Sequence, residues 1–132
     1  MEIIIDTTRD QGFEIALAHD GVIQARNMVN EPFQEAEQLI PSIEKILSDQ
    51  GVPAHDVSEV WVVAGPGRFT AVRIGVAVAQ AFAYAMNIPL RSIERLSPDE
   101  SLSDMISRFL VADHRVCVQP VYDKDPHITQ SV

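Results

Sequence analysis

The residues whose types and spacing could do chemistry gather around one turn, Gly65-Pro66-Gly67, which Arg68 follows. A predicted helix begins there, and the free N–H groups and dipole of a helix N-terminus attract anions such as phosphate. Arg68 would add a positive charge to such a site, or it is an ordinary exposed arginine. The spacing is not that of a P-loop, and no lysine follows. We therefore favour a structural turn, with phosphate binding at Gly65, Gly67 and Arg68 as the alternative.

No conventional catalytic set accompanies this turn. Cys117 falls in a predicted strand, where a lone cysteine is more often buried filler than a nucleophile. The histidines are scattered along the chain rather than grouped as metal ligands: His19, His55, His114 and His127. We therefore predict no catalytic residue, no metal site and no enzymatic activity of the chain acting alone.

Short strands must position the turn. Runs of apolar and alternating residues predict strands over residues 2–6, 13–19, 22–29, 60–64, 88–93 and 115–121. A hairpin turn at Asp20-Gly21 would join the second strand to the third. Because a Gly-Pro-Gly turn follows the fourth strand directly, we expect that strand to be buried and to end at the candidate site.

Helices separate the later strands. One is predicted over 34–50, where Pro41 would cause a late start or a kink, and another over 71–86. A last helix would open with Ser97 as its N-cap and Pro98 as its first residue. Three antiparallel strands followed by helix, strand, helix and strand are typical of an α/β ribonuclease H-like lobe, with a mixed sheet and flanking helices.

Composition and charge narrow the function classes. The 132 residues are 46% hydrophobic and 22% charged, which is typical of a folded globular protein, and we expect a single lobe over 1–122 with a flexible tail over 123–132. The net charge of −9 argues against direct binding to nucleic acid. A single cysteine excludes a disulfide framework, and no signal-peptide pattern opens the chain, so we expect the cytoplasm. The apolar run at 71–86 is too short for a membrane span and contains Arg73.

The predicted helix at 71–86 also suggests an interface. Small residues recur every four positions and form a smooth ridge that lets two helices approach closely. The alternative is that the ridge packs on the protein's own sheet, and both can hold because the helix is apolar on both sides. The predicted partner-binding residues on this helix and the preceding one are Leu39, Ile43, Ala71, Val72, Gly75, Val76, Ala79, Ala83 and Tyr84.

Four segments carry a resemblance to a known family. In order and spacing, Ile3–Thr8, Leu39–Leu47, Gly65–Gly75 and Asn87–Leu90 resemble the TsaB (YeaZ) family over roughly residues 1–97. The resemblance implies the actin/Hsp70-like ATPase fold and an accessory role in forming threonylcarbamoyladenosine in tRNA. It further implies pairing with a TsaD-type catalytic subunit, a TsaE-type ATPase as a further partner, and a homodimer when the chain is alone.

The chain departs from the family pattern at several positions, among them Gln34-Glu35-Ala36, where the family often has His-Ser or similar before the first helix. Arg68 stands where the family usually has serine, and Ala71 stands where it usually has glycine. Members also carry a second lobe, for which this chain has little room. Because Val118–Tyr122 resembles the family's own C-terminal segment, we expect an internal loss of that lobe.

Asp6 and Thr7 lie where actin-like ATPases place their first phosphate loop. A working loop there uses an acidic residue for Mg²⁺ and glycine-rich backbone to approach phosphates. Arg9-Asp10-Gln11 follows instead, with glycine only at position 12. We therefore favour a strand end in which Asp6 caps the turn. ATP or ADP with Mg²⁺ is expected only in a complex with the partner.

We hold one main hypothesis for the function of this chain and two alternatives. The main hypothesis is a non-catalytic scaffold that binds and stabilises the TsaD-type subunit, which itself meets the tRNA. The first alternative is a weak nucleotide-binding protein or ATPase of the actin-like fold. The second is a self-associating regulatory homodimer that uses the same helix ridge on itself.

Overall fold

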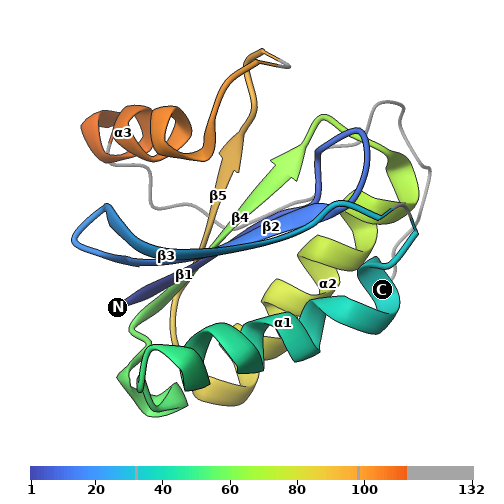
Figure 1. Cartoon of the computed structure of the whole chain (residues 1–132). Helices are drawn as coiled ribbons and strands as arrows, with labels where there is room; N and C mark the ends of the chain where they lie inside the picture. The colour runs from blue at the N-terminus through green and yellow to red at the C-terminus, as the bar shows by residue number, and fades with distance from the viewer. Residues whose placement is uncertain (32, 98, 113–132) are drawn as a thin grey trace.

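The N-terminal half of the sheet is an antiparallel meander of three strands (Figure 1). β1 (Glu2–Asp6) pairs with β2 (Phe13–His19), and β2 pairs with β3 (Val22–Val29). Asp20 and Gly21, both at positive φ, form the turn between β2 and β3, and this turn conformation suits the twist of paired strands. The three predicted strands and the predicted Asp-Gly hairpin are confirmed.

Two parallel strands complete the sheet on the other side of β1. β4 (Glu59–Gly65) runs parallel to β1, and β5 (Leu90–Glu94) runs parallel to β4. The strand order is therefore β3-β2-β1-β4-β5, with β1 in the centre. Because β1, β4 and β5 point the same way, their carboxyl ends meet at one edge of the sheet, and the segments that follow them lie close together.

Two helices cover one face of the sheet (Figure 1). α1 (Glu35–Asp49) and α2 (Phe69–Met86) pack over Ile3, Ile5 and the other residues of β1, β2 and β4 that point to this side. The predicted late start of α1 is wrong, since the helix runs through Pro41. Its first turn is held by Arg68, which pairs with the buried Glu35 carboxylate at 2.6 Å.

A single turn and a third helix complete the described elements. A short 3-10 helix (Ala54–Asp56) precedes β4, and α3 (Leu102–Ala112) covers the opposite face of the sheet over Ile4 and Trp61. The predicted N-cap at Ser97 is wrong. Ser101 caps α3 instead, because its hydroxyl accepts a hydrogen bond from the Asp104 N–H and the Asp104 carboxylate accepts one from the Ser101 N–H.

The computed structural model describes residues 1–112 apart from 32 and 98. Within these residues the predicted mixed sheet with flanking helices is confirmed. The predicted strand at 115–121, the lobe boundary at 122 and the predicted tail at 123–132 lie outside the described part of the chain.

Candidate functional site

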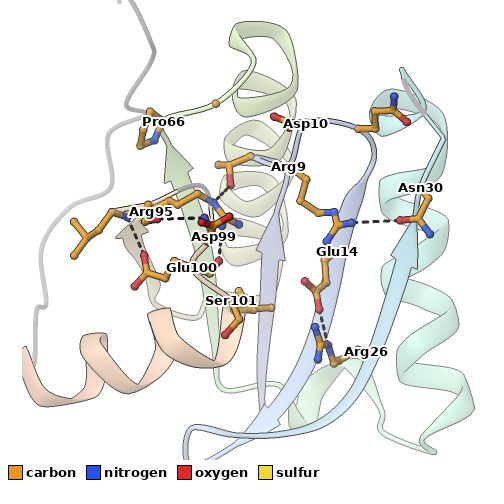
Figure 2. A pocket seen from close by; sticks show the side chains of 16 residues that line it. Arg9, Asp10, Glu14, Arg26, Asn30, Pro66, Arg95, Asp99, Glu100 and Ser101 are labelled. Atoms are coloured by element: carbon orange, nitrogen blue, oxygen red, sulfur yellow. Dashed lines mark hydrogen bonds and ion pairs between the residues drawn. The ribbon is translucent and has the colours of Figure 1, made fainter.

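A cavity of about 790 Å³ opens at the edge where β1, β4 and β5 end (Figure 2). Its walls come from the loop after β1, the turn after β4 and the segment between β5 and α3, together with Glu14, Arg26 and Asn30 from the hairpin. The carboxyl ends of parallel strands are where open α/β sheets most often bind ligands. This edge is therefore the place to test the residues that the sequence singles out for phosphate binding.

Asp6, at the end of β1, is almost completely buried with 1% of its surface exposed. One carboxylate oxygen accepts hydrogen bonds from the Thr8 N–H (2.9 Å) and the Thr8 hydroxyl (2.5 Å). The other accepts one from Nη2 of Arg95 at 2.7 Å, and Nε of Arg95 donates to the Thr8 hydroxyl at 2.9 Å. Asp6 therefore caps the turn after β1, as the favoured interpretation predicts, and an arginine neutralises its charge.

The Gly65-Pro66-Gly67 turn packs directly against the loop after β1. A Cβ atom on Gly67 would lie 2.9 Å from the Thr8 Cα, so only glycine allows this approach. Gly65 has a φ of 131°, which favours glycine, and its carbonyl accepts a hydrogen bond from the Arg95 N–H at 2.9 Å. Gly67 thus lets the turn after β4 contact the loop after β1, and the Gly65 carbonyl connects the end of β4 to the residue after β5.

Arg68 is neither an exposed arginine nor a free cation at the cavity mouth. Its guanidinium donates to the carbonyl oxygens of Arg9 (3.0 Å) and Gly12 (3.2 Å) and pairs with Glu35. These contacts tie the loop after β1 to the first turn of α1. The local role of Arg68 is structural.

The residues at this edge do not fit a bound Mg²⁺–nucleotide. The acidic residue that would meet Mg²⁺ is paired with Arg95, the glycine backbone is packed against Thr8, and Arg68 is held by Glu35. Thr7 is fully buried, so its hydroxyl cannot reach a phosphate in the cavity. No group of three His, Cys, Asp or Glu side chains within the described residues could hold a metal ion.

An ion-pair network continues from this edge into α3. Arg108 donates to both carboxylate oxygens of Glu100 at 3.0 Å, and its other contact is the Glu94 carbonyl. The hydrogen bond from Arg108 holds the pKa of Glu100 below its ordinary value of 4.5, helped by the Leu96 N–H and opposed by burial. The segment between β5 and α3 is therefore fastened at both ends.

The predicted partner ridge is buried in the protein's own core, which is a correction. A Cβ atom on Gly75 would come within 2.9 Å of the Thr7 Cγ2, so the small residues let α2 pack closely on the end of β1. The alternative, in which the ridge packs on the protein's own sheet, describes the structure. The predicted partner-binding residues that are buried are Leu39, Ile43, Ala71, Val72, Gly75, Val76, Ala79 and Ala83.

The outer face of α2 carries a second row of small residues. Ala77, Ala81 and Ala85 also recur every four positions, and all three are exposed. Beside them lies Tyr84, the ninth predicted partner residue, with 89% of its surface exposed, while Ile40 on the neighbouring α1 is 55% exposed. We call these five residues the outer row. Within the described part of the chain the structure thus leaves these apolar residues uncovered, together with the exposed Arg73 and Gln80 on the same side of α2.

α2 is also the one helix among the described residues whose length and composition would suit a membrane span. The argument that residues 71–86 are too short is therefore superseded, since α2 has 18 residues. A third of the helix is buried, and its inner face packs on β4. Because its inner face packs on the sheet, we interpret α2 as a core helix of the lobe.

This chain is similar in sequence and in structure to known proteins. The chain is 29% identical over 96 residues to the tRNA threonylcarbamoyladenosine biosynthesis protein TsaB of Escherichia coli, covering 73% of this chain and 41% of that protein. It is 28% identical over 96 residues to the TsaB of Bacillus subtilis, with 73% and 42% covered. The solved structure of YeaZ from Pseudomonas aeruginosa superimposes with a TM-score of 0.66 at 29% identity, over 72% of this chain and 44% of that one. The chain is thus similar to TsaB (YeaZ) proteins over 72–73% of its length.

The likeness to the solved YeaZ structures shows that the fold is actin-like, or ribonuclease H-like, α/β. Residues 34–97 also match the family described as TsaD, tRNA N6-adenosine threonylcarbamoyltransferase, which shares this architecture. The chain spans only about two fifths of the length of the TsaB and YeaZ proteins that it matches.

Sequence reasoning missed Arg95 as a residue of this edge. Arg95 directly follows β5, just as Asp6 ends β1, and polar residues that close neighbouring parallel strands meet at one edge. That rule could have found the pair from the predicted strands alone. The same reasoning could not have found Arg108, because its partner Glu100 was expected inside the last helix.

Proposed function

We propose that this chain is a non-catalytic scaffold subunit of the machinery that forms N6-threonylcarbamoyladenosine in tRNA, and that it binds and stabilises the TsaD-type catalytic subunit. The names of its relatives support the pathway. The observation that carries the scaffold role is the outer row on α2 and α1, an exposed apolar helix face in a small lobe.

The shape and chemistry of the outer row suit a helix or loop of another protein. Three alanines at four-residue spacing form a smooth surface on which a partner backbone can lie closely. Tyr84 projects beside them, and exposed tyrosines are among the commonest anchors of protein interfaces. The charged residue on this side of α2 is Arg73, one turn before Ala77, and its guanidinium lies over the Phe69 ring at 5.2 Å from the ring centroid.

The same proposal assigns chemistry and RNA binding to the partner. At the carboxyl edge, Asp6 and Arg68 are engaged in contacts within the lobe, which leaves them unsuited to act as base or phosphate ligand. A net charge of −9 is unfavourable for a tRNA backbone. We expect a cytoplasmic protein that needs no cofactor of its own and that meets a TsaE-type ATPase through the assembled complex.

Size exclusion with light scattering, on this chain mixed with the TsaD-type subunit from the same source, tests the proposal. We expect a stable heteromeric complex that is lost in Ala81→Arg, which places a bulky charge on the outer row. Ser103→Arg is the matched control, because Ser103 is exposed on α3 at the opposite face of the sheet. Loss of the complex in both variants, or in neither, would contradict the assigned surface.

Two other results would favour the alternatives. If the wild-type chain forms its own dimer and ignores the TsaD-type subunit, the regulatory homodimer replaces the scaffold. If ADP with Mg²⁺ raises the melting temperature of the isolated chain and Asp6→Ala abolishes the rise, the nucleotide-binding alternative replaces it.

A further inference from the structure

One arginine connects the ends of all three parallel strands. The backbone N–H of Arg95 donates to the Gly65 carbonyl at the end of β4, and its guanidinium donates to Asp6 and Thr8 after β1. A further guanidinium nitrogen donates to the Glu100 carbonyl in the segment that leads to α3. Figure 2 shows Arg95 between the loop after β1 and the Glu100 segment.

The burial of this pair requires an internal positive charge. Asp6 is 1% exposed, and the Arg95 side chain is 11% exposed. A carboxylate that is removed from water is stable only when it is paired and hydrogen-bonded. Either a hard divalent ion such as Mg²⁺ or a cationic side chain can fill such a position at the end of a strand, and a guanidinium adds directed hydrogen bonds.

We propose that Arg95 is the resident counter-ion of Asp6 and takes the place that Mg²⁺ has in nucleotide-binding members of this fold. The arginine closes this edge to Mg²⁺ and Mg²⁺–nucleotides, and at the same time it anchors the segment that leads into α3. The inference goes beyond the proposed function and does not depend on it, since it concerns what the edge binds and not which protein the outer row meets.

Removal of Arg95 tests the exchange of one cation for the other. In Arg95→Gln the buried Asp6 loses its charge partner, so the melting temperature should fall by about 10 °C or more in NaCl. Millimolar MgCl₂ at matched ionic strength should recover part of that loss, because Mg²⁺ can now reach Asp6. Wild-type protein should show no Mg²⁺-dependent shift, with or without ADP.

Three further variants separate this effect from general salt stabilisation. Arg91→Gln is the matched control, because Arg91 lies on β5, the strand that Arg95 follows, with its side chain 12% exposed, and pairs with Glu59 at 3.0 Å. It should lose stability without recovery in MgCl₂. The double variant Asp6→Asn/Arg95→Gln should also show no Mg²⁺-dependent shift of its melting temperature. Arg95→Lys keeps a positive charge beside Asp6 and should show no such shift either.

The outcomes decide the proposal in either direction. If Arg95→Gln does not fold in NaCl, refolding in MgCl₂ alone supports it, and failure to fold in both overturns it. It is also overturned if Mg²⁺ or Mg²⁺–ADP stabilises the wild-type chain as much as it stabilises Arg95→Gln. Equal recovery of Arg91→Gln in MgCl₂ would reduce the effect to non-specific stabilisation and would likewise reject it.

Discussion

The two rows of small residues on α2 have nearly the same composition and the same four-residue spacing, but opposite surroundings. The inner row, Ala71, Gly75, Ala79 and Ala83, is buried against the sheet, whereas Ala77, Ala81 and Ala85 face outward. Small residues at helical spacing therefore indicate that something approaches the helix closely. They do not say whether the approaching surface belongs to the same chain.

The neighbouring residues distinguish the two rows. The inner row has Val72 and Val76 on its flank and meets Thr7 at Gly75, so it completes the core. The outer row instead includes the exposed Tyr84, and its residues form part of the molecular surface. One helix therefore holds the fold together with one face and leaves another face exposed, where we propose that the partner binds.

The largest expected difference between the rows comes from placing arginine on each. Gly75→Arg should prevent folding of the lobe, because even a Cβ atom there clashes with Thr7 and the guanidinium would be buried without a partner. Ala81→Arg should unfold at the wild-type denaturant concentration. Circular dichroism in a urea titration compares the two, and a folded Gly75→Arg would contradict the assignment of the inner row.

Two adjacent residues on α1 provide a second comparison between a buried and an exposed position. Leu39 is 1% exposed and Ile40 is 55% exposed. Leu39→Ala should reduce the free energy of unfolding by about 2–5 kcal/mol, because it leaves a cavity in the core. Ile40→Ala should change it by no more than about 0.5 kcal/mol. Similar losses in chemical denaturation of the two variants would mean that α1 faces the sheet differently.

Tyr84 links the outer row to binding without a role in stability. Tyr84→Ala should weaken the complex with the TsaD-type subunit by about 2 kcal/mol, or roughly 30-fold in Kd, since exposed aromatic anchors dominate interfaces. Its melting temperature should match that of the wild type. Isothermal titration calorimetry gives the affinity, and an unchanged Kd would remove Tyr84 from the interface.

The smallest expected effect is a pH dependence at the α3 segment. The pKa of Glu100 is lowered below 4.5 in the folded chain by Arg108, so the stability from this pair is fully present above pH 4.5 and is lost as the pH falls through the lower folded value. Glu100→Gln should therefore be less stable than wild type at neutral pH, and the difference should shrink below pH 4.5. Urea titrations across that range measure it, with Glu44→Gln on the exposed side of α1 as control.

The strands were largely predictable from the sequence, whereas the start of α3 and its contacts with the segment after β5 were not. Successive side chains of runs such as Ile3–Ile5 and Val60–Val63 point alternately into the cores on the two faces of the sheet. Such short apolar runs predict buried strands, and their order along the chain is read directly from the sequence. The predicted start of α3 is wrong by several residues: Ser101 caps the helix, and Glu100 lies before it and pairs with Arg108. That contact joins residues eight positions apart and has no periodic signal.

The ridge shows a different limit of sequence reasoning. Its residues were correctly recognised as a close-packing surface, but a helix that is apolar on both sides has two candidate faces. The choice between them rests on the position of Thr7, which lies far away in the chain and meets Gly75 only in the folded lobe. Spacing along one helix carries no information about that contact.

The most direct test of whether the TsaD-type subunit binds the outer row is the protection of single thiols from labelling. Ala81→Cys and Ser103→Cys, each in a Cys117→Ser background, would be labelled with a maleimide dye with and without the TsaD-type subunit. We expect the subunit to slow labelling at position 81 and to leave labelling at position 103 unchanged. Unchanged labelling at 81 in a mixture where a complex has formed, or protection at 103 instead, would show that the partner does not bind the outer row.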